Sequence, residues 1–105
     1  MSSPPRVYIA HAYSNDPAGN CAKIREICRR LVRMGYHPVA PQLWLDQLFD
    51  EATQREEIMQ YCLDELDSCH MMYRYTPCIG GVAIEVEHAF KYKIPERVMY
   101  YGVEE

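Results

Sequence analysis

Glu85 lies in the segment Gly-Gly-Val-Ala-Ile-Glu-Val-Glu-His-Ala, which spans residues 80–89. The two glycines end a loop, and the carboxylate falls within the first two turns of the helix that follows. Because a helix N-terminus carries partial positive charge and free N–H groups, we expect Glu85 to stay ionised. An ionised, positioned carboxylate can attack a sugar carbon as a nucleophile. On spacing alone, a first-turn acid that only stabilises its helix is the more common interpretation.

The composition limits the classes of protein to which the chain can belong. Its 105 residues, 49% apolar and 25% charged, predict one globular domain with one modest core. The net charge of −4 argues against a nucleic-acid polymer as partner, because such a partner requires a basic face. No apolar run is long enough to span a bilayer, so we expect no membrane partner. Residues 1–5 are predicted to be a disordered lead-in without a signal pattern, and residues 6–105 the domain.

The five cysteines raise the questions of disulfides and of metal ligands. No Cys-x-x-Cys pair occurs. Cys21 and Cys28 are seven residues apart, as are Cys62 and Cys69, which places each pair on one face of a helix. We therefore expect five reduced thiols in a cytoplasmic protein. A zinc site needs three or four convergent ligands, which this spacing does not supply, so no metal is predicted.

Hydrophobic periodicity predicts four strands that alternate with three main helices. The strands are expected over residues 7–10, 37–40, 71–75 and 97–101. The helices are expected over residues 20–34, 53–68 and 82–93, and residues 42–51 are expected either to form a short lid helix or to cover the edge of the sheet.

Local signals add detail to three of these elements. Gly35 predicts the end of the first helix, and Thr53 with Glu56 resembles a capping box at the start of the second. Pro38 predicts an edge position for the second strand. The buried stripe of the last helix is expected to comprise Val82, Val86, Ala89 and Phe90.

The order of elements predicts an α/β fold of flavodoxin-like or Rossmann-like type. We expect a doubly wound parallel sheet of about four to five strands with helices on both faces. In such sheets, ligands bind beyond the carboxyl ends of the strands. The loops 11–19, 41–49 and 76–81 are expected at that edge, and Glu85 lies above it. Tyr8 belongs to the first strand, which should be central.

Three stretches resemble the nucleoside 2-deoxyribosyltransferase-like superfamily, which includes the 2'-deoxynucleoside 5'-phosphate N-hydrolases. They are Val-Tyr-Ile-Ala at residues 7–10, Ala-Pro at residues 40–41, and residues 81–89; short phage and bacterial members look closest. The resemblance implies that Glu85, in the motif Gly-x-x-x-Glu, attacks the anomeric carbon of a deoxyribose, and that Tyr8 hydrogen-bonds to it and positions it. It thus implies base hydrolysis or deoxyribosyl transfer on a 2'-deoxynucleoside or its 5'-monophosphate, without a cofactor.

Three positions differ from the pattern of the family's enzymes. Those enzymes have an acid late in the second helix, where the alignment places Cys62 or its neighbours, and their third strand begins with Cys-Asp or Ala-Asp, where this chain has Cys69 and His70. The hydrolases that take monophosphates have a serine before the third helix, where this chain has Cys78 and Ile79. The differences leave open a second function, a nucleotide-binding sensor or sequestering protein without turnover.

The loops at the sheet edge supply candidate phosphate-binding groups. The backbone N–H groups of Gly80, Gly81 and Val82 are expected to bind a phosphate at the helix N-terminus. Thr76 and Ser14 are the candidate hydroxyl donors.

Other residues at this edge carry two interpretations each. His11 follows the central strand and either faces the ligand or satisfies its own loop. Trp44 and Phe49 either stack on a base or serve packing. His88 lies three residues after Glu85 and either contacts it or faces solvent, whereas His70 is expected to satisfy the entry of the third strand.

The nine tyrosines exceed what a core of this size needs and indicate an interface. The resemblance also implies symmetric assemblies, since members of the superfamily commonly form them. We therefore expect a homodimer or a higher homo-oligomer that binds a small nucleoside or nucleotide.

Overall fold

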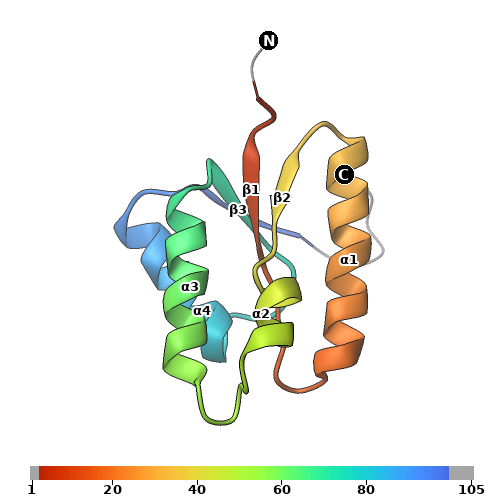
Figure 1. Cartoon of the computed structure of the whole chain (residues 1–105). Helices are drawn as coiled ribbons and strands as arrows, with labels where there is room; N and C mark the ends of the chain where they lie inside the picture. Colours follow the sequence, from red (N-terminus) through yellow and green to blue (C-terminus); the bar gives the residue numbers. More distant parts are fainter. Residues whose placement is uncertain (1–2, 100–105) are drawn as a thin grey trace.

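A computed structural model describes residues 3–99 of the chain as a parallel sheet between helices (Figure 1). The strands are β1 (Arg6–Ala10), β2 (His37–Val39), β3 (Met71–Arg74) and β4 (Glu96–Val98). The helices are α1 (Pro17–Arg33), α2 (Gln42–Leu48), α3 (Arg55–Asp67) and α4 (Gly80–Lys91).

The four strands are all parallel and follow the order β2-β1-β3-β4. β1 is central, and its Tyr8 lies between Val39 of β2 and Met72 of β3. β2 lies at the edge, where Pro38 costs no ladder hydrogen bond. The predicted α/β fold, the central β1 and the edge position of β2 are confirmed.

Two buried clusters hold the helices against opposite faces of the sheet. On one face, Ile24 and Leu31 of α1 pack against Val7 and Ile9. The other face packs against α2, α3 and α4, in a cluster that contains Tyr8, Ala10, Leu45, Cys62, Leu66, Met72, Val82 and Ala89. Because successive residues of β1 point to opposite faces, Tyr8 faces α3 and α4.

α1 begins at Pro17, three residues before the predicted start at Asn20. The Asp16 carboxylate accepts a hydrogen bond from the Gly19 N–H at 3.2 Å, and Pro17 has the φ that a first helical residue needs. The Asn-Asp-Pro sequence that suggests a loop is therefore a helix start. The predicted stop is confirmed, since Gly35 has a φ of +91°.

The other helices also differ from the prediction in part. The capping box is wrong: α3 begins at Arg55, its cap is Gln54, and the side chain of this cap accepts no hydrogen bond from the first turn of the helix. α4 begins at Gly80 rather than Val82, so both glycines lie in its first turn, although Gly80 itself has a left-handed backbone. Phe90 is 87% exposed rather than buried, because Glu85 occupies the buried stripe with Val82 and Ala89.

Some of the predictions for the two ends of the chain fall outside residues 3–99. β3 and β4 end at Arg74 and Val98, and residues 100 and 101 of the predicted last strand lie outside the described residues. The lead-in over residues 1–5 and the domain over residues 6–105 stay predictions. Within residues 3–99, no helix combines the length and the apolar character needed to cross a membrane.

Candidate active site

A cavity of about 520 Å³ opens at the carboxyl ends of β1 and β3. This volume lies within the range of sites that bind small molecules. Its walls come from the loop after β1, from α2 and α3, and from the start of α4, as expected for an open parallel sheet. The sequence-predicted site residues that line it are His11, Ser14, Thr76, Gly80, Gly81, Val82 and Glu85.

Tyr8 and Glu85 meet in the protein interior beside this cavity. The Tyr8 hydroxyl donates a hydrogen bond to Oε2 of Glu85, and the two residues are 0% and 3% exposed. Burial raises the pKa of the Glu85 carboxyl to about 7, while the hydrogen bond from Tyr8 opposes that rise. Burial and the nearby carboxylate raise the pKa of Tyr8 well above its ordinary value, so its hydroxyl stays a donor.

The charge state of Glu85 differs from the sequence-based expectation. Glu85 is the sixth residue of α4, beyond the first turn where the dipole acts most strongly. Burial is the larger effect here, and it favours the neutral acid. Near neutral pH the carboxyl is therefore poised between its two protonation states, which suits a group that must form and break bonds to a substrate.

Cys62 of α3 lies beside this pair. It is 3% exposed and lines the cavity. Burial, the largest cause, and the nearby Glu85 raise the pKa of its thiol to about 12. Cys62 therefore remains a neutral thiol at physiological pH.

The loop after β1 is held in place by side-chain contacts. The ring Nδ1 of His11 lies 2.7 Å from the Ala12 carbonyl, and burial lowers the pKa of this histidine. Thr76 Oγ1 accepts from the Ala12 N–H at 2.9 Å. Ser14 donates to Glu51 at 2.8 Å, so binding a phosphate through Ser14 requires that this contact open.

The N-terminus of α4 presents N–H groups to the cavity. Its cap, Ile79, supplies no side-chain hydrogen bond, and the first turn contains no acid. Gly80 has a φ of +56°, a left-handed conformation that favours glycine. The N–H groups of Gly80, Gly81 and Val82 thus remain available for an anionic or polar ligand.

Trp44 does not line the main cavity. Its ring lies 5.8 Å from that of Tyr61, centroid to centroid, and it contributes to a separate hollow beside β2. Phe49 is the aromatic residue from this segment that lines the cavity. The buried residues of the short helix α2 are Gln42 and Leu45. Trp44 lies between them in the sequence and points to another side of the helix, toward solvent.

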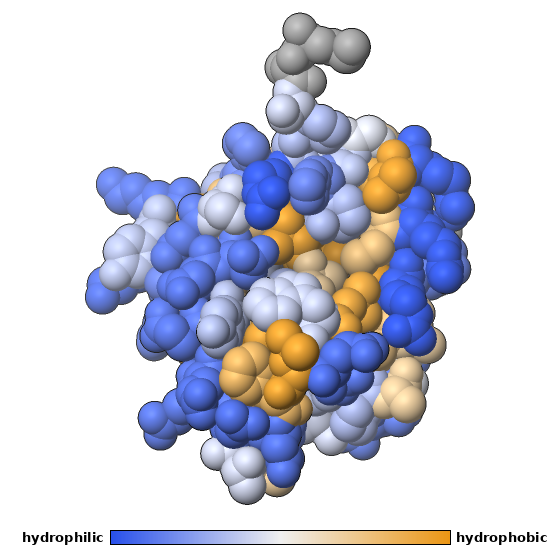
Figure 2. Space-filling model, in the orientation of Figure 1, coloured by the Kyte–Doolittle hydropathy of each residue, from blue (hydrophilic) through white to orange (hydrophobic). Residues whose placement is uncertain are grey.

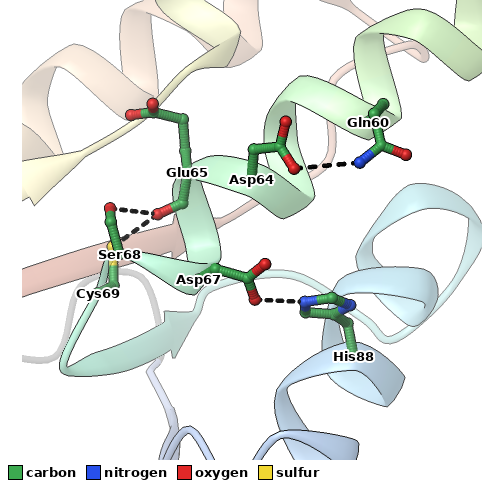
Figure 3. Close-up of polar contacts among 7 residues, drawn as sticks. All are labelled: Gln60, Asp64, Glu65, Asp67, Ser68, Cys69 and His88. Atoms are coloured by element: carbon green, nitrogen blue, oxygen red, sulfur yellow. Dashed lines mark hydrogen bonds and ion pairs between the residues drawn. The ribbon is translucent and has the colours of Figure 1, made fainter.

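Two further histidines, His70 and His88, have structural partners. Figure 3 shows His88 pointing from α4 to Asp67 at the end of α3, and its Nε2 lies 2.6 Å from Oδ1. This contact ties the two helices together, and it replaces the contact with Glu85 that the spacing suggests. His70 accepts the Arg6 N–H at 2.9 Å, which confirms its predicted place at the entry of β3.

Gln42 is a cavity residue that the sequence interpretation missed. It is 8% exposed, and its Nε2 donates to the Ile9 carbonyl at 3.2 Å. Its position in the sequence could have indicated this, because Gln42 directly follows Pro41 just after the carboxyl end of β2. The described residues contain no group of three or more His, Cys, Asp or Glu side chains that could hold a metal ion.

Residues 5–99 match the family model described as a domain of unknown function, DUF7768. The chain belongs to this family. No curated protein matches this DUF7768 chain at a significant level.

Two solved structures share the fold of this DUF7768 domain. The 2-deoxyribosyltransferase of the psychrotolerant bacterium Bacillus psychrosaccharolyticus is 15% identical, with a TM-score of 0.64 over 95% of this chain and 75% of that one. The CMP N-glycosidase of Clostridium botulinum is 12% identical, with a TM-score of 0.53 over 93% of this chain and 90% of that one. The predicted resemblance to the nucleoside 2-deoxyribosyltransferase-like superfamily is confirmed at the level of the fold.

Proposed function

We propose that the protein cleaves or transfers the base of a 2'-deoxynucleoside or its 5'-monophosphate, with Glu85 as the nucleophile. The observation that carries the proposal is the buried Glu85 carboxyl, held by the Tyr8 hydroxyl beside a cavity of about 520 Å³. Burying a carboxyl costs free energy, so a buried carboxyl beside a cavity is a candidate functional group. The shared fold supports the same class of reaction, since the two similar structures are a deoxyribosyltransferase and an N-glycosidase.

The chemistry follows from the positions of these groups. An oxygen of the Glu85 carboxylate attacks the anomeric carbon, the C–N bond breaks, and its electron pair leaves with the base, which takes a proton from solvent. Tyr8 keeps the carboxylate oriented through its hydrogen bond. Water, or a second base, then attacks the same carbon, and the ester bond to Glu85 breaks to regenerate the carboxylate.

The rest of the cavity has the features that a nucleoside requires. The N–H groups of Gly80 and Gly81 and the hydroxyl of Thr76 suit the polar sugar or a 5'-phosphate, and the neutral His11 ring adds a further polar group. Phe49 and the apolar residues of α3 suit the flat face of a base. No step requires a metal ion or an organic cofactor.

The test is chromatography of the free base after incubation with the four deoxynucleosides and their monophosphates. The Glu85→Gln variant removes the nucleophile but keeps the shape, so base release should fall at least about a thousandfold. Glu87→Gln is the matched control, because Glu87 is exposed two residues further along the same helix. Equal loss in both variants, or release that survives in Glu85→Gln, would contradict the proposal.

A second candidate function is nucleotide binding without turnover. Cys62 favours it, because a thiol with a pKa of about 12 is a poor donor of a proton to the leaving base. A binding protein should show a rise in melting temperature with a nucleotide but release no base. The same incubation and a melting curve separate the two functions.

A further inference from the structure

The loops after β1 and β3 are joined to each other where the two strands end. Directly after β3, the Tyr75 N–H donates to the Ala10 carbonyl at 3.0 Å. Two residues further along, the Ala12 N–H donates to a side chain instead, at 2.9 Å from Oγ1 of Thr76. Ala12 and Thr76 both line the cavity, so this contact fixes part of the cavity wall.

Arg74, the last residue of β3, holds the backbone of Thr76. Its Nη1 donates to the Thr76 carbonyl at 3.1 Å, and its Nε donates to Oε2 of Glu96 in β4 at 2.7 Å. The ion pair is partly removed from solvent, since the side chains of Arg74 and Glu96 are 20% and 29% exposed. The planar fork of arginine allows one side chain to make both contacts, which a lysine could not do in the same way. Arg74 therefore couples β4 to a loop that lines the cavity.

These contacts matter for a ligand because of what they leave to the Thr76 hydroxyl. A threonine hydroxyl has one donor and two acceptor positions, and Ala12 occupies only one acceptor position. The hydroxyl can therefore also donate its proton to a ligand oxygen in the cavity. The next three residues of the loop, 77–79, are exposed, so the position of Thr76 depends strongly on Arg74 and Ala12.

We propose that Arg74 is a positioning residue for substrate binding, and that it acts through Thr76. The guanidinium fixes the Thr76 backbone, and Thr76 in turn presents its hydroxyl to an acceptor oxygen of the bound substrate. The inference rests on the proposed function for the identity of the ligand, whereas the contacts of Arg74 belong to the protein alone. Without Arg74, binding must first order the loop, which lowers the affinity for the substrate.

Arg74 acts on binding rather than on bond cleavage. Glu85 lies in the second turn of α4 and is held by Tyr8, a contact that does not involve Arg74. The Thr76 hydroxyl contacts the substrate and the transition state alike, so its displacement weakens the binding of both equally. Loss of Arg74 should therefore raise KM and leave kcat within about twofold of the wild type.

The kinetic test compares Arg74→Met, Thr76→Val and the double variant, with the deoxynucleoside that the wild type cleaves best. Each single substitution should raise KM by about tenfold. Because Arg74 acts through Thr76, KM of the double variant should equal that of Thr76→Val alone, whereas independent effects would multiply. Arg29→Met is the matched control, because Arg29 forms an exposed ion pair with Glu26 on α1, and it should keep the wild-type KM.

Amide hydrogen exchange, followed by NMR, measures the same positioning without any substrate. The Ala12 N–H should exchange at least about tenfold faster in Arg74→Met than in the wild type, because its acceptor is no longer held in place. Arg29→Met should leave this rate unchanged. Glu96→Gln weakens only the contact with Arg74, so it should give an intermediate rate, and it replaces Arg74→Met if that variant does not fold.

The inference is overturned by single increases in KM that multiply in the double variant, or by a kcat that falls while KM stays constant. An unchanged Ala12 exchange rate in a folded Arg74→Met protein, or in Glu96→Gln if Arg74→Met does not fold, would overturn it as well. If no base is released from any nucleoside, the proposed function fails separately. The exchange rates then still decide whether Arg74 positions Thr76.

Discussion

Glu85 is the only carboxylate that is buried among residues 3–99, and its neighbours set its chemistry. Burial raises its pKa to about 7, and the Tyr8 hydroxyl limits that rise. A nucleophile must be ionised, so its activity depends on the balance between these two effects. The neutral Cys62 adds no charge to the site near pH 7.

Base release should rise with pH through about 7, as the Glu85 carboxyl loses its proton. Tyr8→Phe removes the hydrogen bond that favours the carboxylate, so the midpoint should move upward by about one to two pH units. The rate at pH 7 should fall and recover in part at higher pH. The measurement is the pH profile of kcat/KM for both proteins. An unchanged midpoint would mean that Tyr8 does not act on the ionisation of Glu85.

At the scale of elements, the sheet is the part that the sequence predicts well. The apolar run before Ala10 defines a buried strand, and Pro38 and the short length of its segment define an edge. Helix starts are harder, because Asp16 followed by Pro17 is common both in loops and in helix caps. Only the observed hydrogen bond from the Gly19 N–H separates the two.

In the site, too, some residues are predictable from the sequence, whereas others depend on how the elements pack. The pairing of Tyr8 with Glu85 is implied by the family resemblance, and the structure contains that hydrogen bond. Gln42 was not predicted as a cavity residue, because its hydrogen bond to the Ile9 carbonyl depends on how the end of β2 lies against β1. Trp44 was expected at the site because of its residue type, but its direction depends on how α2 packs.

Asp16→Ala should lower the free energy of unfolding by about 1 kcal/mol, because the Gly19 N–H loses its acceptor at the start of α1. Chemical denaturation measures this difference. Arg25→Ala is the control, since Arg25 is exposed on the same helix, and it should change the stability by less than about 0.5 kcal/mol. An Asp16→Ala protein as stable as this control would show that the cap contributes nothing.

At the scale of the whole molecule, the described residues leave several large apolar side chains in contact with solvent. Figure 2 shows an orange, hydrophobic area over α2 within a largely blue surface, and Leu48 of that helix is 67% exposed. Ile79 and Phe90 are 70% and 87% exposed. These side chains are consistent with the predicted homo-oligomer, which stays a prediction, as does the cytoplasmic location.

Glu85 also couples the site to the stability of the whole domain. In the unfolded chain its carboxyl ionises near pH 4.5, and in the folded chain near 7. Between these values the folded state holds a proton that the unfolded state has lost. The proton on Glu85 therefore stabilises the folded state fully below pH 4.5. This contribution to the free energy of unfolding, about 3 kcal/mol, is lost as the pH rises through 7.

Glu85→Gln has no such group, so the stability of the wild type relative to this variant should fall by about 3 kcal/mol between pH 4.5 and pH 8. Urea denaturation of both proteins across this pH range measures the difference. Comparison with the variant cancels the contributions of all other titrating groups. A constant difference would show that burial does not raise the pKa of Glu85.

The most direct test of the central claim is a search for the sugar on Glu85 itself. The protein is mixed with the deoxynucleoside that it cleaves best, quenched in acid during turnover, digested and analysed by mass spectrometry. A covalent nucleophile predicts that the peptide containing Glu85 gains the mass of one deoxyribosyl group, and that Glu85→Gln gives no such peptide. Steady turnover with the sugar on another residue, or undiminished turnover in Glu85→Gln, would contradict the assignment of Glu85 as the nucleophile.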